Sequence, residues 1–349
     1  MVRNIVEMTK QKTKRTTRYT KVQMKRLPIL LLLLVSSFFL HSCKKENKDI
    51  WDVKIETPAE KIPVTDISKD FFAREVTLEQ FRAKYPWFQG SVKDEDFIKR
   101  RNSAEEAKLY REAATKVDLH LLGTDLGALF ARVKHHFPNF KNPKVYTFSS
   151  STQMYEEPVI FDPQQGFLFI DISGFMGEKN HYYKGIEEYF KVSMNPENII
   201  PRTSEAIAFT IVPYSKDSQK FLDQMVYNGK IMTLQDAFLP HLPDHLKMNA
   251  TAKQYEWSKA SEVSIWDYFI ENDYLFSPDP RLTERFINPG PFSKFYTDVD
   301  KQSSPQVGVF TGWQICRKFY EKNPETPLLD FLAMSATDIF NKSEYKPKK

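Results

Sequence analysis

The chain has 349 residues, of which 41% are hydrophobic and 27% are charged. These proportions are those of a globular protein, and they exclude a wholly disordered, collagen-like or polytopic membrane chain. The 28 Phe and 16 Tyr residues greatly outnumber the 11 Gly residues, which favours a helix-rich body with large side chains in its core. The net charge of +5 comes from residues 1–42, which hold nine of the 50 basic residues and one of the 45 acidic residues. The remaining 41 basic and 44 acidic residues give a net charge of −3, so no nucleic-acid partner is expected.

The start of the chain predicts an export signal. Met24 and two basic residues precede 14 mostly apolar residues, Leu27–Leu40, whereas a helix needs about 20 apolar residues to cross a bilayer. We interpret residues 1–42 as a leader with a signal peptide and Met24 as its true start. The sequence that ends this leader, Leu40-His41-Ser42-Cys43, resembles a bacterial lipobox, although its second residue is usually small or apolar.

The lipobox resemblance implies that the thiol of Cys43 takes a diacylglycerol and that cleavage leaves a lipidated N-terminus. Membrane lipid is then the first expected partner, because each buried CH₂ of an acyl chain adds about 0.8 kcal/mol to membrane binding. The alternative is an ordinary signal peptide with an incidental cysteine. Lys44 stands where an aspartate would signal retention in the inner membrane. We therefore expect the periplasmic leaflet of the outer membrane in preference to the inner membrane.

After the lipidated cysteine, residues 43–65 are polar and contain two prolines, which predicts a tether. Residues 66–349 are expected to form a single globular domain. The pattern becomes helical from Asp66, and a helix is expected to begin after Thr77, because a Thr three residues before Gln80 is a capping-box pattern. A charged helix over residues 94–117 and an amphipathic helix over 119–137 follow, the second with apolar residues spaced by three and four.

Three short segments rich in aromatic and β-branched residues predict strands over residues 144–149, 158–161 and 166–173. The rest of the chain predicts helices that end at prolines, over residues 185–192, 202–212, 216–238, 251–275, 305–322 and 326–341. The expected fold class is α+β, mainly helical, with a small β-sheet in the N-terminal half.

The sequence contains no strong active-site motif. His241 and His245 have the spacing of two zinc ligands on a helix, but Pro240 and Pro243 oppose a helix there, so a polar turn is the better interpretation. Two pairs of neighbouring acids, at residues 156–157 and 187–188, are interpreted as solvated surface, since adjacent side chains point in different directions. Cys316 lies in an apolar helical segment and is expected to be buried and unreactive.

Long blocks of the chain occur in one order over nearly the whole mature chain, and they include residues 144–147, 166–170, 221–230, 236–240, 265–272, 285–296, 312–315 and 342–349. These blocks resemble those of the family of the gliding-motility lipoprotein GldB of the Bacteroidetes. The resemblance implies a lipid-anchored envelope protein that is needed for gliding and works with other proteins of the gliding machinery, in organisms with type IX secretion.

A weaker resemblance connects the chain to zinc peptidases of the zincin type, whose helix carries an H-E-x-x-H motif. Aligned by eye, Ser204 and Ala208 stand where the two histidines belong, and Glu205 stands at the glutamate of the motif. Asn228 stands at the third metal ligand. The resemblance therefore implies a zincin-like architecture without zinc, without another cofactor and without catalytic residues, because a single carboxylate cannot hold zinc in a four-coordinate site.

Three functions follow from these patterns. The leading hypothesis is a non-enzymatic, lipid-anchored component that supports the gliding and type IX secretion machinery. The second is an envelope hydrolase or peptidase that uses Glu205. The third is a lipoprotein that binds a glycan or a polypeptide through exposed aromatic residues, although aromatic residues at helical spacing more often belong to a core.

A loop with two prolines is the sequence's candidate for a partner surface. Its conformation is restricted by proline, and it mixes polar and aromatic residues, which suits either a partner site or a rigid structural loop. The candidate residues are Arg285, Asn288, Pro289, Pro291, Phe292 and Tyr296.

Overall fold

The computed structural model describes residues 50–56, 59–214 and 219–348. The predicted leader, Cys43 and Lys44 lie outside the described residues. None of the helices in the described ranges is long and apolar enough to cross a membrane.

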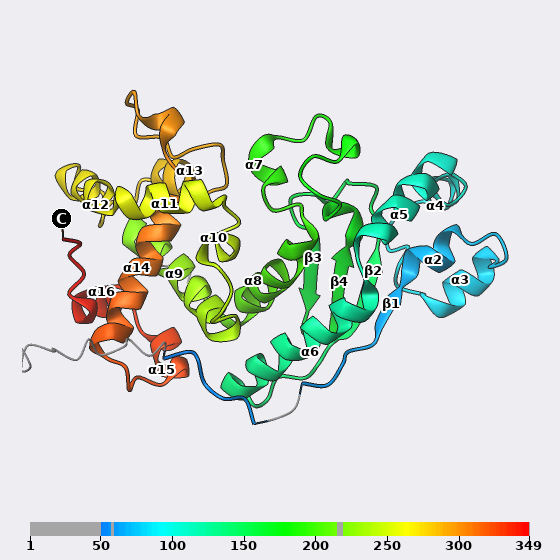
Figure 1. Ribbon diagram of the computed structural model, residues 1–349, viewed down its shortest axis with the longest axis horizontal. Helices are drawn as coiled ribbons and strands as arrows, with labels where there is room; N and C mark the ends of the chain where they lie inside the picture. The colour runs from blue at the N-terminus through cyan, green and yellow to red at the C-terminus, as the bar shows by residue number, and fades with distance from the viewer. Residues whose placement is uncertain (1–49, 57–58, 215–218, 349) are drawn as a thin grey trace, which may run out of the picture. The chain divides into compact units, whose positions relative to one another are not determined.

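A four-stranded sheet lies in the N-terminal half, as predicted. Its strands are β1 (Val64–Asp66), β2 (Lys144–Phe148), β3 (Val159–Asp162) and β4 (Phe167–Asp171). The spatial order is β1-β2-β4-β3, with β1, β2 and β4 parallel and β3 antiparallel to β4 at one edge. Figure 1 shows the sheet between α8 on its β3 side and the first helices of the chain on its β1 side.

The first strand, β1, was not predicted, because residues 43–65 read as a tether. Ile62, just before β1, is buried, and its N–H donates to the carbonyl oxygen of Gly123 at 2.9 Å. A Cβ on Gly123 would collide with that part of the chain, as would a Cβ on Gly127. The packed body therefore reaches further toward the N-terminus than residue 66, and this could not be inferred from the polar local composition.

Five α-helices of the described residues follow β1 in the N-terminal half. They are α2 (Ile67–Phe72), α3 (Leu78–Lys84), α4 (Asp94–Arg101), α5 (Ala104–Lys116) and α6 (Leu119–His136). The capping box at Thr77 and Gln80 is confirmed, with the Gln80 N–H 3.1 Å from the Thr77 hydroxyl. The single helix predicted over residues 94–117 is wrong, because Ser103 caps a new helix by accepting a hydrogen bond from the Glu106 N–H.

The C-terminal half consists of helices and loops. Its helices are α7 (Glu188–Lys191), α8 (Ile199–Ile211), α9 (Phe221–Phe238), α10 (Asp244–Lys247), α11 (Ala252–Ala260), α12 (Glu262–Glu271), α13 (Arg281–Phe286), α14 (Val307–Lys322), α15 (Leu328–Ala333) and α16 (Ala336–Ser343). Pro201, which was expected to precede a helix, lies in the first turn of α8, where its missing N–H leaves no hydrogen bond unmade.

Helices α9 and α14 pack at very close range in the centre of this half. A Cβ on Gly312 of α14 would overlap the carbonyl oxygen of Met225, and a Cβ on Gly229 of α9 would overlap the carbonyl oxygen of Gly312. Cys316, one turn along α14, is fully buried beside Gly229, as expected. The two glycines therefore allow backbone-to-backbone contact that no other residue would permit.

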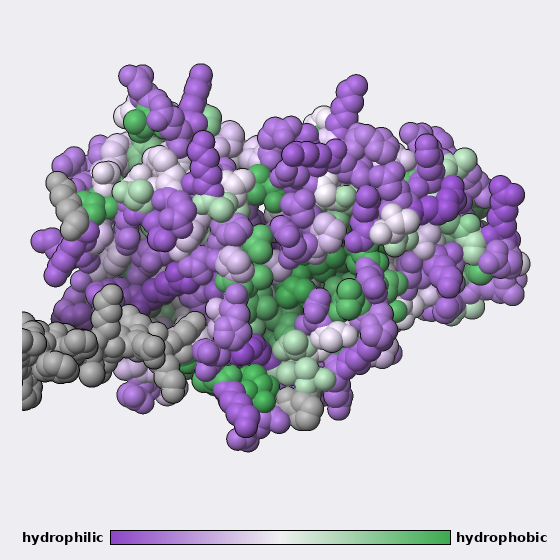
Figure 2. All heavy atoms as spheres, in the orientation of Figure 1, coloured by the Kyte–Doolittle hydropathy of each residue, from purple (hydrophilic) through white to green (hydrophobic). Residues whose placement is uncertain are grey.

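The buried side chains form two clusters. The larger one joins α6, the sheet, α8, α9 and α14, and a smaller one of mainly aromatic residues lies under α2, α3 and α4. Figure 2 shows apolar side chains gathering over the strands and beside α8, on a face that is otherwise mainly hydrophilic. Apolar surface thus remains open where β3 meets α8.

We predict that Gly312→Ala destabilises the protein by about 1–3 kcal/mol, because the added methyl must force α9 and α14 apart. Urea unfolding followed by circular dichroism measures the change. Gly290→Ala is the matched control, since a Cβ there comes no closer than 3.8 Å to another atom. Equal stability of the two variants would contradict the close-packing argument.

Candidate functional site

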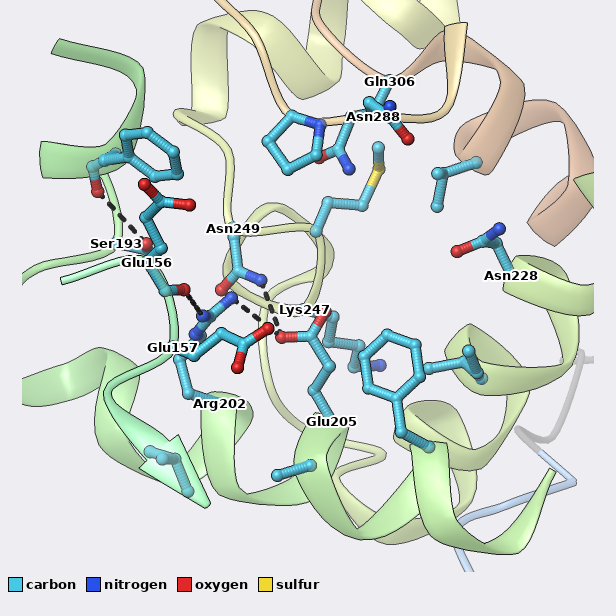
Figure 3. Close-up of a pocket in the computed structure, with 18 of the residues that line it drawn as sticks. Glu156, Glu157, Ser193, Arg202, Glu205, Asn228, Lys247, Asn249, Asn288 and Gln306 are labelled. Atoms are coloured by element: carbon cyan, nitrogen blue, oxygen red, sulfur yellow. Dashed lines mark hydrogen bonds and ion pairs between the residues drawn. The ribbon is translucent and has the colours of Figure 1, made fainter. Parts of the chain in front are cut away.

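A cavity of about 600 Å³ opens between the β3 side of the sheet and the C-terminal helices. Its walls come from β3 and the segment before it, α7, α8, α9, the end of α10 with the segment after it, the proline-rich loop at residues 287–290 and the start of α14. The charged, hydroxyl and amide side chains that line it are Glu156, Glu157, Ser193, Arg202, Glu205, Thr210, Asn228, Lys247, Asn249, Asn288 and Gln306. Figure 3 shows most of them around the cavity.

The cavity also has a large apolar lining. Aromatic rings line it at Tyr155, Phe161, Tyr189, Phe190 and Phe209, and aliphatic side chains add to them from α9 and α14. Phe209 has 47% of its surface exposed, which is high for a side chain of this size. A volume of this size and a mixed apolar and polar lining are typical of ligand pockets.

Glu205 lies on α8 and is held by its neighbours. Its Oε2 atom accepts hydrogen bonds from Arg202 Nη1 at 3.0 Å and from Asn249 Nδ2 at 3.1 Å. Arg202 also donates from Nη2 to the carbonyl oxygen of Glu156 at 2.7 Å. Figure 3 shows these bonds as one connected line from the β3 side of the cavity to the loop after α10. Glu205 therefore ties three segments of the cavity wall together.

Asn249 reaches Glu205 from a strained part of the backbone. Its φ of +51° is in the left-handed region, which asparagine tolerates better than most residues. Its Oδ1 atom is buried and has no hydrogen-bond partner among the described residues. Because this oxygen is buried, it is an unpaired acceptor inside the cavity wall and is not presented to the cavity.

Lys247 belongs to a buried network of ion pairs. Lys247 Nζ is 2.8 Å from Asp236 Oδ1, and Arg317 of α14 contacts both Asp236 and Asp244 at 2.8–2.9 Å. Trp313 Nε1 donates to the same Asp236 carboxylate at 2.8 Å. The side chain of Lys247 is only 3% exposed, so its charge is balanced within the protein and is not offered to the cavity.

Asp244 has a shifted pKa in this network. Burial alone would raise the pKa of its carboxyl, but hydrogen bonds and charge attraction from Arg317, with a hydrogen bond from Tyr255, outweigh burial and hold the pKa at about 2. The ionised form of Asp244 is therefore the form that the folded protein stabilises.

Sequence comparison assigns the chain to a family. The model of the family described as gliding motility protein GldB matches residues 43–347. The chain belongs to the GldB family. It matches no curated protein and no solved structure. Family membership connects the chain with gliding motility, and the zincin-like architecture stays a prediction.

The four positions aligned with zinc peptidases divide into two pairs. Glu205 and Asn228 both line the cavity. Ser204 and Ala208 are fully buried on the other side of α8, and the Ser204 hydroxyl has no hydrogen-bond partner among the described residues. The described ranges contain no group of three or more His, Cys, Asp or Glu residues arranged to hold a metal ion.

Arg285 differs most from its expected place in this GldB-family chain. The sequence predicts Arg285 on an exposed partner surface, but the residue is only 8% exposed. Its guanidinium donates to Lys294 O at 2.7 Å and to Tyr268 Oη at 2.9 Å, and it stacks on Tyr296. Arg285 therefore fixes the loop from inside, because a loop without regular structure needs donors for its carbonyl groups.

The other residues of that block lie at or near the surface. Asn288, Pro289, Pro291 and Tyr296 are exposed, and Phe292 is half-buried. Asn288 and Pro289 line the cavity, which the sequence did not indicate. His241 is exposed in the turn before α10, with its Nε2 atom 3.2 Å from Asp52 Oδ1, whereas His245 lies in α10.

The sequence analysis did not predict two residues that hold the site together. Arg202 stands three residues before Glu205, a helical spacing that suits an ion pair and could have suggested the contact. Asn249 carried no comparable signal, because its contact with Glu205 spans 44 residues.

We predict that Asp244→Asn lowers the free energy of unfolding by about 2 kcal/mol at pH 7. A pKa held at about 2, below its usual 3.8, contributes stability that is present above pH 4 and is lost as the pH falls toward 2. Urea unfolding between pH 7 and pH 2.5 should therefore show a smaller acid loss in the variant than in the parent. Asp267→Asn, at an exposed carboxylate, should keep the parent's acid loss, and identical pH profiles for Asp244→Asn and the parent would refute the assignment.

Proposed function

We propose that this GldB-family protein is a lipid-anchored component of the cell envelope that supports gliding by binding other molecules, without catalysis. The observation that carries the proposal is the extent of the family match, which begins at Cys43, the residue predicted to be acylated. The same residue directly follows the predicted leader, residues 1–42. The family match and the predicted leader thus both support a mature chain that starts at this cysteine.

The anchor follows from the chemistry of the N-terminus. A diacylglycerol on the Cys43 thiol brings two acyl chains, and two chains hold a protein on a membrane far more firmly than one. Lys44 after the cysteine favours the periplasmic leaflet of the outer membrane. Other envelope proteins of the gliding and type IX secretion machinery are then the expected partners.

The surroundings of Glu205 support a binding role. A catalytic carboxylate needs to reach a substrate proton or an activated water. Here one oxygen of Glu205 is occupied by Arg202 and Asn249, which join the cavity walls through it. We therefore assign Glu205 a structural role in keeping the cavity open.

The first experiment tests the anchor. Cys43→Ser should move the protein from the membrane fraction to the soluble fraction and stop colony spreading, because the hydroxyl does not take the lipid. Cys316→Ala is the control for loss of a cysteine, and it should leave the protein in the membrane fraction. A Cys43→Ser protein that stays in the membrane and supports spreading would falsify the anchoring proposal.

The second experiment separates binding from hydrolysis at Glu205. Glu205→Gln keeps an acceptor oxygen for Arg202 and Asn249, so we expect a folded protein and normal spreading, with a stability loss below about 1 kcal/mol. Spreading assays and thermal unfolding of the same variant measure the two effects. Lost spreading with unchanged thermal stability would favour the alternative, an envelope hydrolase or peptidase that uses Glu205.

A further inference from the structure

Strand β3 has a free edge. In the sheet order β1-β2-β4-β3 it pairs with β4 alone, so no strand of the described residues lies on its other side. An unpaired strand edge presents backbone donors and acceptors that can pair with another extended chain.

The hydrogen-bond pattern shows which residues face outward. The Asp171 N–H donates to the carbonyl oxygen of Pro158 at 2.7 Å, just before β3 begins. In an antiparallel pair, the backbone N–H and C=O groups of successive residues point alternately toward the partner strand and away from it. Ile160 therefore pairs with β4, whereas the N–H and C=O groups of Val159 and Phe161 point outward. No hydrogen bond to these outward groups is present within residues 50–56, 59–214 and 219–348.

The free edge faces the cavity. Val159, Ile160 and Phe161 all line it. Consecutive side chains of a strand point to opposite faces of the sheet, so three neighbours can line one space only if that space lies against the strand edge. The outward groups of β3 thus open into the cavity and not onto the open surface.

The charge beside this edge is unbalanced. Glu156 and Glu157, on the segment that leads into β3, line the cavity and have no ion-pair partner in the described part of the chain. Glu205 is paired with Arg202, and Lys247 is paired with Asp236. Figure 3 shows Glu156 and Glu157 along the wall that also carries Arg202. Two uncompensated negative charges therefore stand at the end of the free edge.

We propose that the cavity binds an extended polypeptide segment that adds to β3 as a further strand and places a Lys or Arg side chain against Glu156 and Glu157. Backbone groups of the segment pair with Val159 and Phe161, which repeat at the two-residue period of a strand. Apolar side chains of the segment then contact Phe209, Ile287 and Val309. This inference rests on the proposal that the body acts by binding.

A polypeptide fits these observations better than a glycan. A sugar ring is recognised through side-chain hydrogen bonds and aromatic stacking, and it would leave the regularly spaced backbone groups of β3 unused. A strand uses these groups directly. The negative charge selects a basic segment among polypeptides, because opposite charge steers partners and like charge repels them.

The test uses the full-length lipidated protein, purified from membranes in detergent. A phage-displayed library of random linear 12-residue peptides is selected on it, and the enriched peptides are synthesised. We expect enriched peptides with at least one Lys or Arg and with alternating β-branched residues. No enrichment, or enrichment of acidic peptides, overturns the proposal.

The best enriched peptide is then measured against two variants of one residue. Val159→Pro removes the outward N–H and keeps the β3–β4 pairing, because proline is tolerated where an edge strand's N–H faces away from the sheet. It should weaken binding about tenfold. Val159→Thr keeps both the N–H and the branched shape, and it should bind like the parent. Equal binding by the two variants overturns strand addition.

Two further measurements test the proposal if Val159→Pro folds poorly. Glu157→Gln changes only an exposed side chain, and it should weaken binding of the basic peptide several-fold. In the parent, peptide binding should slow amide hydrogen exchange at Val159 and Phe161. Unchanged exchange at both amides, or displacement of the peptide by peptidoglycan fragments, overturns the proposal.

The outcome also separates this inference from the function proposed above. A peptide that binds through β3 and is then cleaved would contradict the non-catalytic role and leave strand addition intact. A peptide that never binds, with Cys43→Ser still lost from the membrane, would contradict strand addition and leave the anchor intact.

Discussion

Backbone contact between α9 and α14 is the constraint on which the C-terminal half depends. Gly229 and Gly312 remove the side chains that would hold the two helices apart. At that range Asp236 of α9 can accept hydrogen bonds from Trp313 and Arg317 of α14. Burying a carboxylate is costly unless it is paired and fully hydrogen-bonded. The short distance between the helices provides those partners, so packing and electrostatics stabilise the same pair.

The same contacts position the cavity. Lys247 of α10 is held by Asp236, and two residues later Asn249 donates to Glu205 of α8. Arg202 extends this connection to the segment before β3. Each step is a hydrogen bond or ion pair between different segments, so the walls are fixed relative to one another before any ligand arrives. A pre-formed cavity loses less conformational entropy on binding than one that must be assembled.

An open strand edge is unusual in a protein that avoids self-association, because such edges pair readily with other chains. Here the edge of β3 is short and lies inside a cavity beside two carboxylates, which limits what can reach it. If the proposed lipid is attached at Cys43, it holds this body at the membrane, and the proposed strand site then selects among the polypeptides there.

Local signals in the sequence determined the helix cap at Thr77, the three strands from residue 144 to residue 171, the amphipathic α6 and the family. These features depend on neighbouring residues or on long blocks in a fixed order. Only the tertiary structure decided that β1 joins the sheet, that Arg285 is buried and that Glu205 contacts Asn249. Such contacts join residues far apart in the chain. Whether they form depends on the packing of whole helices and strands, which no local pattern of residue types encodes.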